Sequence, residues 1–249
     1  MWPFAAEGLV VAWTGTGVPT PGFRVDAGIF RELSHVGSNR EDDDRLEARG
    51  GRSGFEGAGA DLLKACQASN ELSIEVMVQC DNDHQSGPAR ILGYSRDGNL
   101  RNFSLCQEGG EYRLRLRTSG SDLNGMSPEV TLGPVDPDNE QHIMISYRPG
   151  ELRCFIDGEE QDVKSPSGDF SNWAGEQMAL VLGNEHLSER PWRGTVRKVA
   201  VYSRCFAEKE LVWRPKMAMQ SGWKAKAILK GRDRDDDRNK KTKGDKKDR

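Results

Sequence analysis

The feature that most constrains this fold is a run of alternating apolar and polar residues that begins at His142. In 142–147 every second side chain is apolar, so these side chains share one face of a predicted strand. The segment 151–156 repeats the same period after a break at 148–150. Asp157-Gly158 then predicts a tight hairpin turn, because both central residues of such a turn need positive φ. This pattern indicates an antiparallel sheet.

Other parts of the chain carry the same signal, and the turns between them are rich in glycine, as the total of 28 glycines suggests. Further strands are predicted at 9–13, 71–79, 90–94, 101–107, 112–118, 180–184 and 192–204. In 112–118 the pattern places Leu114 and Leu116 inward and three arginines outward. Short helices are predicted at 61–67 and from about residue 207, while 23–52 is interpreted as an irregular polar region. The predicted class is all-β and antiparallel, with short peripheral helices.

Three short sequences carry a family resemblance, namely "FIDGEE", "LGN" and "WRGTVRKVAVYSRCFAEKEL", in that order. With the strand that ends at Tyr147 before them, they resemble the laminin-G-like, concanavalin A-like lectin/glucanase superfamily, and bacterial laminin-G-like modules most of all. In the last sequence Gly194, Tyr202 and Leu211 fall where that signature expects them. The resemblance implies an antiparallel jelly-roll β-sandwich. It implies no ligand, since the superfamily spans lectins, enzymes and structural modules.

The expected organisation is an N-terminal extension (1–7), one laminin-G-like domain (8–215) and a charged tail (216–249). Residues 231–249 hold nine Lys or Arg and six Asp and no apolar residue, so we expect disorder there. The formal net charge of the whole chain is −3, and the folded domain is therefore not expected to bind nucleic acid.

The sequence gives mixed indications of compartment. The N-terminus lacks the basic and apolar regions of a signal peptide, which predicts a cytoplasmic protein if the start is correct. The resemblance implies instead a secreted or cell-surface protein. No apolar run approaches twenty residues, so no transmembrane segment is expected. The five cysteines show no zinc-binding spacing and are expected to be reduced or structural.

A catalytic alternative rests on two acids of one predicted strand. Retaining glucanases of the resembled superfamily carry an acid triplet along a strand, and here Glu71 and Glu75 keep its outer positions around Ser73. Their Cα atoms are expected about 13 Å apart, whereas retaining chemistry needs carboxyl groups about 5 Å apart. Without the central acid, a degenerate or unusual glycoside hydrolase stays the second hypothesis.

Calcium is the cofactor that the resemblance implies, because related sandwiches hold Ca²⁺ at one rim with loop oxygens. Calcium takes six to eight oxygen ligands. The candidate donors lie in three loops and are Asp81, Asp83, Asp97, Asn99, Asn184 and Glu185. Ordinary turn chemistry also explains acidic and amide residues at such positions.

The leading hypothesis is a non-catalytic binding or adhesion-type module that recognises carbohydrate or a protein partner through loops at one rim. Tyr94 and Trp192 are the candidate ligand-binding residues, because exposed aromatic rings stack on sugars, although large aromatics near strand ends more often bury area. A structural accessory domain without its own ligand is the third hypothesis.

Overall fold

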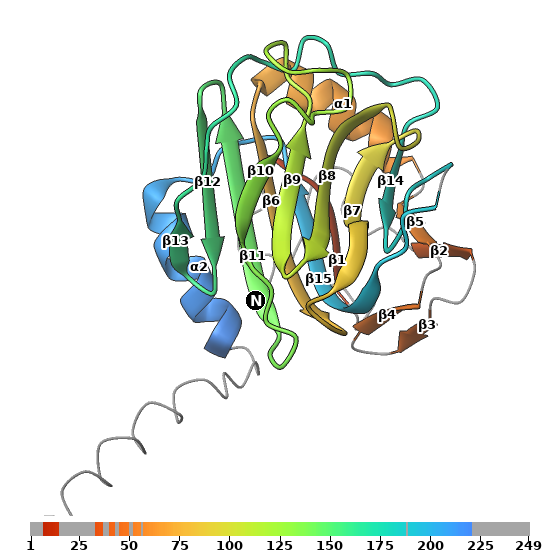
Figure 1. The fold of residues 1–249 in the computed structure, drawn as a ribbon. Coiled ribbons are helices and arrows are strands. Elements are labelled where there is room, and N and C mark those ends of the chain that lie inside the picture. The colour runs from red at the N-terminus through yellow and green to blue at the C-terminus, as the bar shows by residue number, and fades with distance from the viewer. Residues whose placement is uncertain are drawn as a thin grey trace, which may run out of the picture.

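The computed structural model describes residues 7–14, 33–36, 40–42, 45–49, 52–55, 57–187 and 189–220. These residues form fifteen strands and two helices, and the strands make two antiparallel sheets that pack face to face (Figure 1). The predicted all-β sandwich with short peripheral helices is therefore confirmed. Residues 216–220 continue a helix, and the rest of the expected charged tail lies outside the described residues.

The first sheet has eight strands, and the strand that comes last in the chain lies near its centre. Its order is β13 (Glu159–Gln161), β12 (Glu151–Ile156), β11 (Gln141–Arg148), β6 (Leu72–Cys80), β15 (Arg193–Tyr202), β4 (Arg45–Arg49) and β3 (Arg40–Asp42), and β1 (Leu9–Thr14) also pairs with β15. In the β11–β12 pair Ile145 lies opposite Cys154, and both side chains are buried in the core, as the alternation predicted. We call this the eight-stranded sheet.

The second sheet has seven strands and faces the viewer in Figure 1. Its order is β10 (Val130–Pro134), β9 (Glu111–Leu116), β8 (Arg101–Gly109), β7 (Gln85–Ser95), β14 (Ala179–Leu182), β5 (Arg52–Phe55) and β2 (Leu33–Val36). Apolar side chains of both sheets meet between the layers and form one continuous core. Burial of these side chains is the main force that holds the sandwich closed.

The region from 23 to 52 differs from its expected irregular structure. Four short strands, β2 to β5, cover parts of 33–55 and extend both sheets. Their residues are mostly polar, and short strands at sheet margins are held by backbone pairing more than by a hydrophobic face. Leu46 and Ala48 of β4 are nevertheless buried. A hydrophobicity pattern is a weak signal for such strands.

Helix α1 (Ala58–Ser69) is longer than the predicted segment 61–67 and contacts one strand of each sheet, β1 and β14. It buries Leu62 and Cys66 and ends at Asn70, whose left-handed backbone lets its N–H donate to the carbonyl of Cys66. The helix thus closes one end of the sandwich (Figure 1).

Helix α2 (Glu208–Gln220) lies against the outer face of the eight-stranded sheet (Figure 1). Phe206 precedes the helix and is buried with Leu211 in a small apolar cluster on that face. The Glu210 carboxylate accepts a hydrogen bond from the Ala207 N–H at 2.9 Å, which is half of a capping box. No helix among the described residues is long and apolar enough to cross a membrane.

Glu210 makes the attachment of α2 sensitive to acid. Burial raises its pKa, but hydrogen bonds from Arg204, from the Ala207 N–H and from Arg214 outweigh burial and lower the pKa from 4.5 to about 2. A group whose pKa is lower in the folded state stabilises the fold above its unfolded pKa, and this stability is lost as the pH falls toward 2.

We therefore expect Glu210→Gln to reduce the free energy of unfolding by about 1–3 kcal/mol at pH 7 and by less at pH 3. Urea unfolding of both proteins at the two pH values measures the difference. Glu208→Gln is the matched control, since the Glu208 carboxylate is exposed and should contribute little. An equal loss at both pH values would show that the charge of Glu210 is not the cause.

Candidate functional site

The outer face of β8 and β9 carries several arginines. In β9 the side chains of Leu114 and Leu116 point into the core. By the period of a strand, Arg113 and Arg115 project from the opposite face, and Arg117 follows directly after the strand. Arg115 and Arg117 are each only 7% exposed. The alternating sequence of this segment thus concentrates positive charge on one surface.

The neighbouring strands offer little side-chain bulk beside Arg115. Ser104 of β8 lies opposite Arg115 in the sheet, and Gly93 of β7 lies opposite Ser104. A Cβ atom at Gly93 would meet no heavy atom closer than 3.6 Å. Long arginine side chains from both sides can therefore extend over this part of the sheet.

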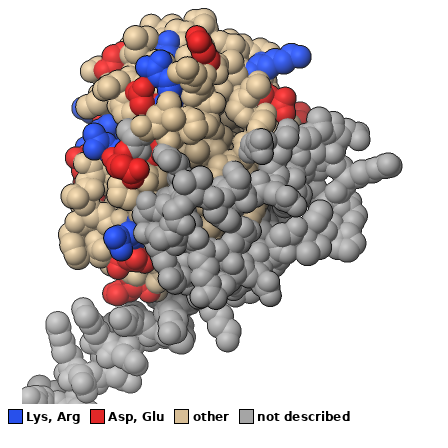
Figure 2. Space-filling view, turned by 90° about the vertical axis from the view of Figure 1, so that its right-hand side faces the viewer, with Lys and Arg blue, Asp and Glu red and all other residues tan. Residues whose placement is uncertain are grey.

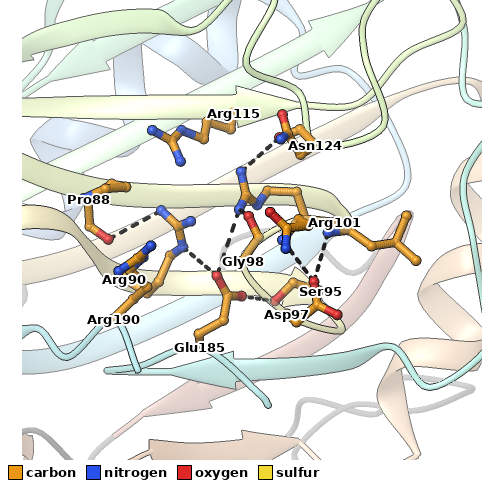
Figure 3. A network of polar contacts seen from close by, with 12 residues as sticks. Pro88, Arg90, Ser95, Asp97, Gly98, Arg101, Arg115, Asn124, Glu185 and Arg190 are labelled. Atoms are coloured by element: carbon orange, nitrogen blue, oxygen red, sulfur yellow. Dashed lines mark hydrogen bonds and ion pairs between the residues drawn. The ribbon is translucent and has the colours of Figure 1, made fainter. Parts of the chain in front are cut away.

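Glu185 joins this face from the loop that follows β14. Its carboxylate accepts a hydrogen bond from Arg90 Nε at 2.9 Å and a short one from the Ser95 hydroxyl (Figure 3). Arg101 Nη2 lies 4.0 Å from the same carboxylate, and all three charged side chains are fully buried. We call Arg90, Arg101, Arg115 and Glu185 the arginine cluster.

Arg101 lies at the centre of the cluster, between Arg115 and Glu185 in Figure 3. Its guanidinium donates to the backbone carbonyls of Asn124, at 2.9 Å, and of Gly98. Burial and then the neighbouring charge of Arg90 lower its pKa to about 10, although Glu185 opposes this change. Arg101 is therefore a buried cation with a second cation, Arg90, close to it.

On the other side of the cluster, Glu129 holds the arginines of β9. Its carboxylate accepts a short hydrogen bond from Arg115 Nε and lies 3.2 Å from Arg113 Nη1. Several buried polar atoms on the outer face of β7, β8 and β9 nevertheless have no hydrogen-bond partner. These atoms are Arg90 Nη2, Arg101 Nε, Ser104 Oγ, and Nε and Nη1 of Arg117. Buried donors without partners are costly in free energy.

The two acids of the hydrolase hypothesis lie on the opposite side of the molecule. Glu75 is fully buried beneath α2, where its carboxylate is 2.9 Å from His142 Nε2 and 2.7 Å from Arg214 Nη1. Glu71 accepts a hydrogen bond from the Cys205 N–H at 2.7 Å. Both carboxylates therefore serve contacts with the segment before α2 or with α2 itself.

The calcium candidates do not meet at one point in a form that suits a cation. Among the described residues, no group of three or more His, Cys, Asp or Glu is arranged to hold a metal ion. Asp97 accepts hydrogen bonds from Arg96 and from two backbone N–H groups of its own turn. Glu185 is paired with Arg90, so its carboxylate is already neutralised. Asp97 and Glu185 are therefore already engaged by nitrogen donors.

The remaining calcium candidates are engaged in local structure. Asn184 Oδ1 accepts the N–H groups of Glu185 and Arg190 and shapes the loop that carries Glu185. Asp83 lies 3.2 Å from His84, both being exposed. Asp81 and Asn99 belong to the two loops at either end of β7. The loop of Asn184 is therefore a support for the arginine cluster.

The two aromatic candidates are core residues. Tyr94 is 1% exposed, and its hydroxyl donates to the Gly59 carbonyl of α1 at 2.8 Å. Trp192 is fully buried, and its indole N–H donates to Gln107 at 3.0 Å. The expected exposed rings are thus absent at these two positions, because each ring fills space between elements.

Sequence reasoning located part of the arginine cluster. The alternation in β9 predicted its outward arginines, but Arg90 and Arg101 gave no signal, since each stands alone in its segment. Glu185 was a candidate only as a calcium ligand, and not as a partner of arginines. Surface charge also gives no guide in the view of Figure 2, where basic and acidic side chains of the described residues are interspersed. Only the pairing of β7, β8 and β9 brings these residues together.

Solved structures with similar folds include several carbohydrate-related proteins. A Trypanosoma rangeli sialidase in complex with 2,3-difluorosialic acid is 14% identical with a TM-score of 0.53, over 78% of this chain and 30% of the sialidase chain. Domain 4 of AbnA, a GH43 extracellular arabinanase from Geobacillus stearothermophilus, in complex with arabinotriose, is 15% identical with a TM-score of 0.54, over 82% of this chain and 96% of that domain. The receptor-binding domain of botulinum neurotoxin C/D mosaic serotype is 10% identical with a TM-score of 0.58, over 86% of this chain and 52% of that chain.

At these identities the likeness concerns the fold alone. The chain spans about 30% of the length of the sialidase chains that it matches. A search of the curated proteins gave no match. The family model Laminin_G_3, described as the concanavalin A-like lectin/glucanases superfamily, matches residues 56–212, which is more than half of the sequence. The chain therefore belongs to this family, as its sequence motifs indicated.

Proposed function

We propose that this domain is a non-catalytic glycan-binding module that binds its ligand on the outer face of β7, β8 and β9. The observation that carries this proposal is the arginine cluster, which gathers buried hydrogen-bond donors without partners on that face. Sugars present many acceptor oxygens, and a small number of well-placed polar groups is what fixes the orientation of such a ligand.

Binding without cleavage is favoured by the state of the two acids. A retaining hydrolase needs one carboxyl group as an acid and a second as a nucleophile, both in contact with the scissile bond. Here Glu75 is paired with Arg214 under α2, and Glu71 is bound to a backbone N–H. A domain of similar fold, domain 4 of the arabinanase AbnA, was solved in complex with arabinotriose, which supports the proposal of glycan binding.

The proposal is tested by combining retention with a cleavage assay. The full chain is run through gels that contain neutral, carboxylated or sulfated polysaccharides, and the same polysaccharides are assayed for released reducing sugar. We expect retardation by at least one polysaccharide, unchanged by EDTA, and no release of reducing sugar. Two outcomes would refute a non-catalytic glycan-binding module. One is release of reducing sugar, and the other is that none of the polysaccharides retards the protein.

A further inference from the structure

We propose that helix α2 is a lid that opens in acid while the sandwich beneath it stays folded, an inference independent of the glycan-binding function proposed above. The first argument is that α2 lies outside the core. Among the described residues, the core between the two sheets contains none from α2. Leu211 of α2 belongs to the small apolar cluster on the outer face of the eight-stranded sheet, where Figure 1 places the helix. Detachment of α2 therefore leaves the core buried between its two sheets.

The second argument identifies the hinge at Ala207. The two residues before Ala207 are anchored to the sheet by contacts that do not involve α2. The Cys205 N–H donates to the Glu71 carboxylate at 2.7 Å. The Phe206 N–H donates to the Ser146 hydroxyl at 2.8 Å. Ala207 stands at the N-cap of α2, because its carbonyl begins the helical hydrogen bonds, and its side chain cannot cap the first turn.

The third argument is that charged groups hold the described part of α2 on the sheet. Of the α2 side chains that the structure describes, at 208–214, Leu211 is the only apolar one that is buried. Arg214 Nη1 lies 2.7 Å from the Glu75 carboxylate and 3.2 Å from the Tyr202 hydroxyl. Helices in proteins are stabilised chiefly by the packing of an apolar face. One leucine with ion pairs holds this end of α2 less firmly than such a face does.

The fourth argument is that the polar groups beneath α2 are incompletely satisfied. The Glu75 carboxylate lies 2.9 Å from His142 Nε2, but His142 Nδ1 and Arg214 Nε are buried without a hydrogen-bond partner. Lys198 of β15 interacts with the same carboxylate, and burial lowers the pKa of Lys198 although Glu75 opposes this change. Buried polar groups without partners are costly in free energy. Opening of α2 restores their hydration and therefore costs less than release of a fully satisfied network.

The fifth argument gives the direction of the pH dependence. The Glu210 carboxylate faces Arg204 before the hinge, the Ala207 N–H, and Arg214 of its own helix. Burial raises its pKa, but these hydrogen bonds outweigh burial and lower the pKa to about 2. In the open lid Glu210 no longer meets Arg204, so its pKa returns toward the ordinary value of 4.5. The open state then binds a proton more readily than the closed state, and opening increases as the pH falls from 4.5 toward 2.

The second ion pair of the lid does not reverse this direction. The Glu208 carboxylate is bound by Arg153 of β12, which also binds Glu160 of β13. The Arg153 guanidinium lowers the pKa of Glu208, so acid weakens this pair as well. Glu208 is exposed, however, and water screens the pair, so it contributes little. Glu210 is therefore the group that sets the pH of opening.

Hydrogen exchange of the full chain, followed by mass spectrometry, tests the lid at pH 7 and at pH 3. Protection is the intrinsic exchange rate of an amide divided by its observed rate, so the effect of pH on the exchange chemistry cancels. We expect the amides of 211–214 to lose protection about tenfold or more between pH 7 and pH 3. The amides of β6 and β11, which pair with each other in the sandwich, should keep their protection.

Glu210→Gln removes the acid-sensitive group. This variant should lower the protection of 211–214 at pH 7 and should make that protection nearly the same at pH 3. Glu208→Gln is the matched control, because it removes an exposed carboxylate from the same turn of the helix. The control should keep the pH dependence of the unmodified chain.

A variant with the opposite effect keeps every charge in place. Ala207→Ser completes the capping box with Glu210 and should raise the protection of 211–214 several-fold at pH 7. Ala207 is exposed, so the serine fits without repacking. Ala207→Val at the same position cannot accept a hydrogen bond and should give no such rise.

Three results would overturn the acid-opened lid. The first is an equal loss of protection in 211–214 and in β6 and β11, since α2 would then detach only when the whole sandwich unfolds. The second is protection of 211–214 that does not change with pH, or that is already absent at pH 7. The third is a pH dependence that persists in full in Glu210→Gln.

Discussion

Glu75→Gln is expected to reduce the free energy of unfolding by about 3–5 kcal/mol, because it breaks a buried ion pair and leaves one partner charged. Glu75 is bound at 2.7 Å by Arg214 of α2 and at 2.9 Å by His142 of β11. Glutamine has the same shape but no charge, so Arg214 keeps only Glu210 as a carboxylate partner. Urea unfolding at pH 7, followed by tryptophan fluorescence, measures the loss.

A double-mutant cycle isolates the ion pair from the loss of shape. Glu75→Gln combined with Arg214→Met removes both charges together. We expect the double variant to lose at least 1 kcal/mol less than the sum of the single losses. Glu159→Gln, at an exposed position of β13, is the control for a change of charge alone. Strictly additive losses would mean that Glu75 and Arg214 do not stabilise each other.

Gly194→Ala is the second large effect, with an expected loss of about 3 kcal/mol or failure to fold. Gly194 lies in β15 between Cys80 of β6 and Ala48 of β4. A Cβ atom there would lie 2.4 Å from the carbonyl oxygen of Gln79 and 2.5 Å from the ring of Trp192. Neither the strand backbone nor a fully buried indole can move away cheaply.

Gly110→Ala provides the comparison for Gly194→Ala. The nearest heavy atom to a Cβ at Gly110 is the carbonyl oxygen of Asp83 at 3.6 Å, which is an ordinary contact. Thermal unfolding should show a change within about 0.5 kcal/mol for Gly110→Ala. Similar melting temperatures for the two variants would show that β6 and β15 can separate at little cost.

The parts of the fold that could be predicted are those where one strand face is buried. The alternation of β6, β9 and β11 follows directly from this burial. The turn at Asp157 and Gly158 was also predictable, and both residues have positive φ, at 54° and 85°. Strands β2 and β3 could not be predicted in this way, since their sequences show no such period and they are held by pairing with β5 and β4.

The site was harder to predict because it depends on buried charge. Arg90, Arg101 and Glu185 are expected at the surface from their residue types, and they are buried only because they meet one another. These residues are as many as 95 positions apart in the chain. Conversely, Tyr94 was a reasonable candidate for ligand stacking, but helix α1 covers its ring. A single sequence does not report such tertiary partners.

The contacts around Arg204 have a practical consequence for anyone who wishes to tether this domain. Arg204 donates to the carbonyl of Glu7, and the Ser203 N–H donates to the carbonyl of Gly8, so the start of β1 is anchored close to the start of α2. Both belong to the eight-stranded layer, on the far side from the arginines. A sensor chip or a fluorescent reporter that is joined at the start of β1 should therefore leave the proposed glycan-binding face of β7, β8 and β9 unobstructed.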